Sequence, residues 1–166
     1  MPESQIKQLI LLSQNLLKEI NESLEHFLNF HAINNLVYNE GQIVKTCELL
    51  SDLRHLLVNC ENTYQKLGVV ARSHHFNKDF AEQILYETVY LCVHKFYYPA
   101  HEVYEEDGRH SYTGKDAIKF SYTPHPDIKK IILALSKTFE VLREELSYYE
   151  TDYVTKKRLQ QGEQFD

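Results

Sequence analysis

Residues 77–99 read NKDFAEQILYETVYLCVHKFYYP, and this stretch decides the fold class. Asn77 is a suitable N-cap, because its side-chain oxygen can accept a hydrogen bond from an unpaired backbone N–H at a helix start. Pro99 ends the helix, because proline has no N–H to donate and disfavours helical geometry in its predecessor. The apolar residues of the helix predicted over 78–97 cover a wide arc, which is typical of a central helix with several neighbours.

Two further helices are predicted on the N-terminal side of this central helix. Apolar residues recur at intervals of three and four over 4–30 and again over 42–67, so each segment has one apolar face. Gly68 is expected to close the second helix, because glycine readily adopts the left-handed conformation of a helix C-terminus.

A fourth helix is predicted over 127–158, where the apolar period continues for more than twenty residues. Residues 160–166 are expected to form a flexible, frayed tail. Four amphipathic helices with mostly short connections predict a mainly α fold, a four-helix bundle-like single domain over residues 1–166.

A β-hairpin is predicted over 101–123, between the third and fourth helices. Its residues alternate in polarity at period two, as in Ile118, Phe120 and Tyr122, and Asp107-Gly108 is a strong turn dipeptide. The segment has two strands, or three if residues 109–112 form a middle strand. An isolated hairpin is marginally stable in water, so this one is expected to lie against the helices.

The overall charge argues against a nucleic-acid partner. The 166 residues include 18 Lys and Arg against 24 Asp and Glu, a formal net charge of −6, so no broad cationic surface attracts phosphate. No apolar run approaches membrane-spanning length and the first residues do not resemble a signal peptide, so no membrane contact and a cytoplasmic location are expected. Cys47, Cys60 and Cys92 are expected to be reduced and to face the core.

Metal and cofactor chemistry finds little support in the spacing. The sequence has nine histidines but no HExxH, CxxC, GxSxG or phosphate-binding glycine motif, so no cofactor and no catalytic residue are predicted. A ligand set of His31, Glu87 and His94 could assemble across helices, since Glu87 and His94 lie two turns apart. The alternative, which the spacing favours, is that they are boundary residues with local hydrogen bonds.

Residues 107–115 read DGRHSYTGK and are the most donor-rich turn of the chain. Arg109, His110, Tyr112 and Lys115 could bind a phosphate or carboxylate, through bidentate arginine contacts and the lysine charge. The alternative is an ordinary solvated hairpin tip, which is polar for the same compositional reason.

Tyrosine is concentrated in two places. Tyr97, Tyr98 and Tyr104 lie around the start of the predicted hairpin, and Tyr148 and Tyr149 lie on the last helix. Such residues either seal the hairpin onto the bundle or form a surface for a protein partner, since tyrosine is enriched at interface hot spots.

The stretches KFYYP (95–99), YTGKDAIKF (112–120) and EELSYYETDY (144–153) resemble a family of small, uncharacterised cytosolic proteins of Bacillus-type bacteria, a domain of unknown function. The resemblance implies a cytosolic bacterial protein and supplies no substrate or catalytic residue. The first functional hypothesis is therefore a non-enzymatic protein that binds a protein partner or a second copy of itself. The alternative is a protein or enzyme that binds a small anion at 107–115.

Overall fold

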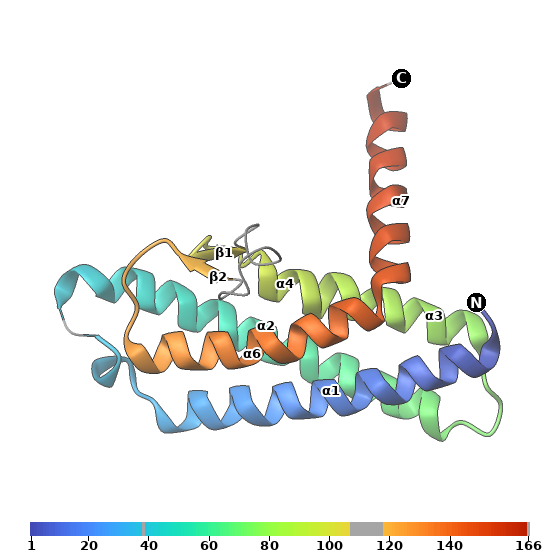
Figure 1. Cartoon of the computed structure of the whole chain (residues 1–166), viewed down its shortest axis with the longest axis horizontal. Coiled ribbons are helices and arrows are strands. Elements are labelled where there is room, and N and C mark those ends of the chain that lie inside the picture. The colour runs from blue at the N-terminus through green and yellow to red at the C-terminus, as the bar shows by residue number, and fades with distance from the viewer. Residues whose placement is uncertain (38, 107–117, 166) are drawn as a thin grey trace.

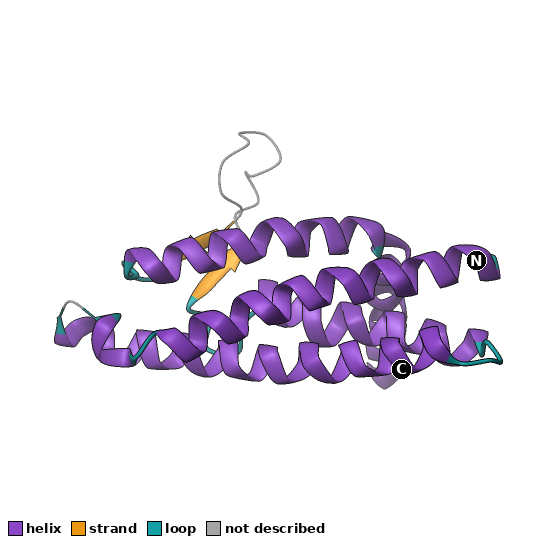
Figure 2. Ribbon diagram, turned by 90° about the horizontal axis from the view of Figure 1, so that it is seen from below, coloured by secondary structure: helices purple, strands orange, loops and turns teal. Residues whose placement is uncertain are grey.

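Long helical rods run side by side along the length of the molecule in two perpendicular views (Figures 1 and 2). The computed structural model describes residues 1–37, 39–106 and 118–165. The rods are α1 (Glu3–Phe30), α2 (Ile43–Arg72), the continuous run α3 (Lys78–Glu87), η3 (Thr88–Val93) and α4 (His94–Tyr97), and α6 (Pro126–Glu145). Two 3-10 turns, η1 (Ile33–Asn35) and η2 (Glu40–Gln42), connect α1 to α2. The predicted mainly α fold is confirmed.

The four rods share one buried apolar cluster, to which each contributes the stripe of its own sequence. Phe96 and Phe139 stack at its centre with ring centroids 4.4 Å apart, and both are fully buried. Burying side chains of this size stabilises the fold by about 2 kcal/mol each. The central position predicted for the third helix follows from this packing, because η3 contacts α2, α6 and α7.

Two expectations for the second helix are wrong. α2 continues to Arg72, and Gly68 lies buried inside it, where an added Cβ would come within 3.4 Å of Gln14 on α1. Gly68 therefore lies in the interior of α2 and does not end it. Cys47 is exposed, because the buried face of the first turns passes through Thr46 and Leu49.

The third rod is interrupted by the π-helix η3 (Thr88–Val93). A π turn disturbs the regular backbone bonding, and such turns are frequent at functional sites. Asn59 on α2 donates its side-chain N–H to the Leu91 carbonyl at 3.3 Å, and the Thr88 hydroxyl bonds the Ile84 carbonyl at 2.8 Å. These side chains support the backbone of the segment that leads to His94.

The predicted hairpin lies between the third and fourth rods, as expected. β1 (Tyr104–Glu106) and β2 (Ile118–Phe120) are antiparallel, with Tyr104 opposite Phe120. Tyr104 is buried and donates its hydroxyl hydrogen bond to the Phe96 carbonyl. Nearby, Asp52 accepts hydrogen bonds from the backbone N–H of His101 at 3.1 Å and from its ring Nδ1 at 2.6 Å. The described residues hold two strands, and a third strand at 109–112 would lie outside them.

The single helix predicted over 127–158 is two helices. Leu146, with φ −99° and ψ 19°, leaves helical geometry, and α7 (Ser147–Phe165) then stands away from the bundle (Figure 1). Leu146 and Tyr149 are both fully buried, so the apolar period continues across the break although the direction changes. α7 extends to Phe165, where the sequence predicts a frayed tail over 160–166.

Candidate functional site

Arg143 on α6 joins the end of the hairpin to the start of α7. Its Nε donates to both carboxylate oxygens of Glu150, at 3.1 and 2.9 Å, and its Nη1 donates to Glu106 at 2.9 Å. The three side chains are 24%, 23% and 35% exposed, in that order. Charge-assisted bonds of this kind are about twice as strong as neutral ones. Glu106 ends β1, so one guanidinium fixes both segments.

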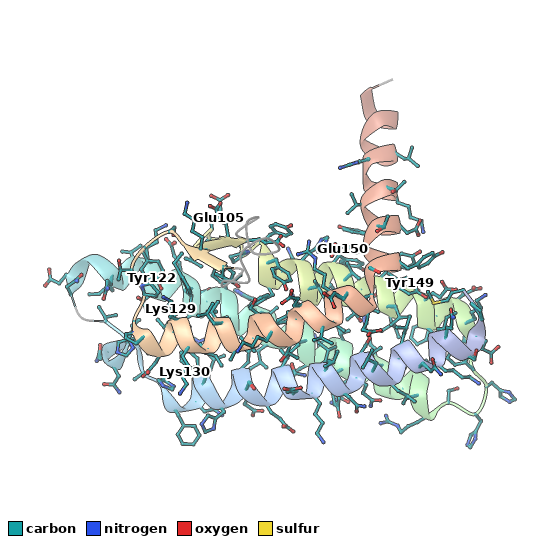
Figure 3. The ribbon with its side chains drawn as sticks, in the orientation of Figure 1. Glu105, Tyr122, Lys129, Lys130, Tyr149 and Glu150 are labelled. Carbon is teal, nitrogen blue, oxygen red and sulfur yellow. The ribbon has the colours of Figure 1, made fainter. Side chains whose placement is uncertain are left out.

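His94, at the start of α4, completes this cluster. Its Nε2 lies 3.3 Å from Glu150, and its ring contacts that of Tyr153 on α7 at 5.7 Å. We call Arg143, Glu106, Glu150 and His94 the Arg143 junction. Figure 3 shows Glu150 at the base of α7, over the bundle.

The electrostatics of the Arg143 junction favour its ionised form. The hydrogen bond from His94 holds the pKa of Glu150 below its usual value. Partial burial raises this pKa, but the hydrogen bond and the charge of Arg143 lower it further. Partial burial lowers the pKa of Arg143, but its bonds to the carboxylates outweigh this and the pKa lies above its usual value. Burial raises the pKa of Tyr97, whose ring lies 4.7 Å from the guanidinium.

The chemistry of the Arg143 junction is that of a brace. Arg143 uses two of its donor nitrogens on carboxylates of the protein itself, and Glu150 is shared between Arg143 and His94. Such a network positions the elements that carry it, because every member is held by another. It therefore fixes the direction in which α7 leaves the bundle.

A second set of contacts holds the first turns of α7. Tyr149 is fully buried, and its ring meets that of Tyr86 on α3 edge to face at 5.0 Å. Tyr86 also donates a hydrogen bond to Asp152, and Lys156 lies 4.6 Å over the Tyr86 ring. Burial and the bond to Asp152 raise the pKa of Tyr86 above its ordinary range. Among the side chains described, these contacts end at Lys156.

One face of α7 is left open by this arrangement. We call it the outer face of α7; its residues are Tyr148, Thr151, Thr155, Leu159 and Gly162, all of them exposed. Tyr148 is 52% exposed and Leu159 is 64% exposed. The side chains at the start of this helix leave a shallow space of ≈ 410 Å³, open to solvent, between Ser147, Tyr148, Thr151, Asp152 and Thr155.

The predicted anion site at 107–115 falls outside the described residues, so Arg109, His110, Tyr112 and Lys115 stay a prediction.

The metal candidates each have a different partner. His31 bonds the Phe27 carbonyl at 2.9 Å, Glu87 pairs with Lys66 at 3.0 Å, and His94 pairs with Glu150. Within 1–37, 39–106 and 118–165, no three His, Cys, Asp or Glu side chains gather closely enough to hold a metal ion. His31, Glu87 and His94 are therefore not brought together as one ligand set.

The predicted interface tyrosines divide into two groups. Tyr98 and Tyr148 are 54% and 52% exposed and are available to a partner. Tyr97, Tyr104 and Tyr149 are buried in the core, so their assignment to a surface is wrong. Their large rings seal the hairpin and α7 onto the bundle instead.

The sequence analysis missed Arg143, Glu106 and Glu150. Arg143 and Glu150 lie off the apolar stripe and have the ordinary appearance of solvated helix residues. Glu150 lies seven positions after Arg143, across the break at Leu146, and this is not the spacing of three or four at which helix side chains pair.

The comparisons agree with the resemblance drawn from the sequence. None of the described helices is long and apolar enough to cross a membrane. An uncharacterized protein of Bacillus subtilis (strain 168), YpuI, is 34% identical over 104 residues, which cover 63% of this chain and 58% of that relative's length. No solved structure matches the chain. A family model described as a protein of unknown function, DUF3907, matches residues 12–155, and the chain therefore belongs to this family.

Proposed function

We propose that this chain acts through contact with another protein, made by α7 and the surface at its base, and that it does so in the cytoplasm. The observation that carries the proposal is the position of α7, whose outer half stands clear of the bundle (Figure 1). Leu159 on that half is 64% exposed, and an added Cβ at Gly162 would meet nothing within 4 Å.

The energetics of helices support this proposal. A single helix of this length is marginal in water, and most helical stability in proteins comes from packing an apolar face. The outer half of α7 displays an apolar side chain to solvent and includes Gly162, which costs about 1 kcal/mol relative to alanine inside a helix. A protein partner that covers Leu159 would supply the missing packing.

The Arg143 junction supports the proposal from the other end of α7. Glu150 in its first turns is held by Arg143 and His94. Holding a binding element in one direction before it meets its partner reduces the entropy lost on association. A brace of this kind is more useful for presenting a helix than for catalysis.

The experiment compares two substitutions of equally exposed residues in the full chain. Leu159→Glu places a charge on the outer half of α7, and Val44→Glu places one at the start of α2, where Val44 is 65% exposed. We expect Leu159→Glu to weaken association about tenfold or more, as loss of a central apolar contact does. Val44→Glu should have no effect.

Association is measured by sedimentation velocity for self-association and by capture from a lysate with the chain as bait. Circular dichroism verifies that both variants keep the helix content of the wild type. The proposal fails if Leu159→Glu retains both the sedimentation behaviour and the captured proteins of the wild type.

A further inference from the structure

We infer that the space between the β-hairpin and the end of α4 binds a small organic cation, held by the carboxylate of Glu102 against the rings of Tyr98 and Phe120. The site is separate from the outer face of α7, so the inference goes beyond the proposed function and does not depend on it. It follows from the lining of this space, the backbone of Glu102 and the charges around it.

The space, which we call the hairpin hollow, lies where α4 ends. It is half open, has a volume of ≈ 560 Å³, and is lined by the end of α4, the turn after it and both strands of the hairpin. Figure 3 labels Glu105, on the strand β1 that lines it. A volume of this size is typical of small-molecule sites. Tyr98 is exposed and Phe120 is partly buried, so both rings offer surface that a ligand can cover.

Glu102, in the turn after α4, has a strained backbone. Its φ is 52°, in the left-handed region that glycine adopts freely and other residues adopt at a cost in free energy. The turn closes through the Glu102 N–H, which donates to the Pro99 carbonyl at 3.1 Å, and glycine would supply the same N–H. Local structure therefore does not account for a glutamate at this position. Strained residues of this kind cluster at active sites and ligand clamps.

The carboxylate of Glu102 is the charge that the hairpin hollow leaves unbalanced. The other charged residues of its lining, Glu105 and Lys119, lie opposite each other in the hairpin register, where opposite charges attract. Glu102 is exposed, and within the described part of the chain its carboxylate has no hydrogen bond or ion pair. Two carboxylates against one lysine leave this lining with one net negative charge, beside two aromatic rings.

This combination favours an organic cation over other small ligands. A cation over the face of an aromatic ring is attracted by its electrons, and proteins recognise quaternary ammonium ions in this way. The Glu102 carboxylate supplies the counter-charge for a cation, whereas it would repel a phosphate or a carboxylate. A bare metal ion is a poor fit, because no three His, Cys, Asp or Glu side chains among those described gather closely enough to hold one.

Titration of the full chain with choline tests the inference. The matched control ligand is 3,3-dimethylbutan-1-ol, which has the shape of choline without its charge. Binding is followed through the backbone amide NMR signals of residues 98–105 and 118–121. We expect saturable shifts of these signals with choline, and binding of the alcohol that is weaker by about tenfold or more. No saturable shift with choline, or equal binding of the alcohol, overturns the inference.

Two substitutions of Glu102 separate ligand binding from a structural role. Glu102→Gln keeps the size of the side chain and removes its charge, so the affinity for choline should fall by about tenfold or more. Glu102→Gly also removes the carboxylate but suits the positive φ, so it should lose affinity and yet melt at or above the wild-type temperature. Glu19→Gln is the matched control and should bind choline as the wild type does, because Glu19 is exposed on α1 and lies outside the lining of the hairpin hollow.

Either substitution can overturn the inference. If Glu102→Gln binds choline as tightly as the wild type, the carboxylate does not hold the cation. If Glu102→Gly melts well below the wild type in circular dichroism, the glutamate side chain stabilises the turn and its role is structural. Neither result bears on the proposed function, which is tested separately by Leu159→Glu.

Discussion

Replacing Arg143 by methionine tests the brace that holds α7. The change keeps a long side chain over the Tyr97 ring but removes the guanidinium charge that pairs with the carboxylates of Glu106 and Glu150. A broken, fully buried ion pair costs about 3–5 kcal/mol, and these side chains are about a quarter to a third exposed. The unfolding free energy should therefore fall by about 2 kcal/mol, once solvent screening is allowed for.

The assay is thermal unfolding followed by circular dichroism at neutral pH, where this loss lowers the Tm by about 4–8 °C for a chain of this size. Lys7→Met is the matched control, because Lys7 and Glu3 form an ion pair at 3.2 Å that is more than half exposed. Such surface pairs contribute less than about 1 kcal/mol. Equal Tm values for Arg143→Met and Lys7→Met would refute the reasoning.

Three further predictions use the same structure. The pKa of Glu150 is lowered in the folded state, so its stabilising contribution is present above the unfolded pKa and is lost as pH falls through the folded pKa. In urea unfolding, the difference in unfolding free energy between wild type and Glu150→Gln should therefore shrink below about pH 4.5. A difference that stays constant down to about pH 3 contradicts this prediction. Phe139→Ala should cost about 3–5 kcal/mol in urea unfolding, and a loss under about 1 kcal/mol would contradict its stacked place in the core. Native protein should react rapidly with Ellman's reagent at Cys47 alone, because Cys60 and Cys92 are buried and Cys47 is exposed. The hydrogen bond with the Cys92 thiol and burial also raise the pKa of Cys60. A second rapidly reacting thiol contradicts this prediction.

The sequence is sufficient to predict the bundle because apolar periodicity reports directly on burial. Ile6, Ile10, Leu17 and Leu24 follow one face of α1 and all are buried. The Asn77 cap is likewise confirmed, since its side chain accepts the Phe80 N–H at 3.1 Å. Local signals of this kind need no knowledge of distant residues.

The break at Leu146 and the Arg143 junction could not be predicted in the same way. Leu142, Leu146 and Tyr149 are all buried, so the period carries no sign of the change in direction. Arg143 meets Glu106 across 37 residues of sequence, and that contact exists only after the hairpin has docked. Periodicity predicts which residues are buried, whereas charge pairing between elements depends on the tertiary arrangement.

The central claim is that α7 is a helix whose outer half becomes covered when the protein associates. Hydrogen exchange measured by mass spectrometry at low and high micromolar concentration tests it most directly, because amide exchange reports local opening. We predict that exchange in residues 157–165 slows as concentration rises, while exchange in the buried part of α1 stays unchanged. Equally fast exchange of residues 157–165 at every concentration, with or without a captured protein, would contradict the claim.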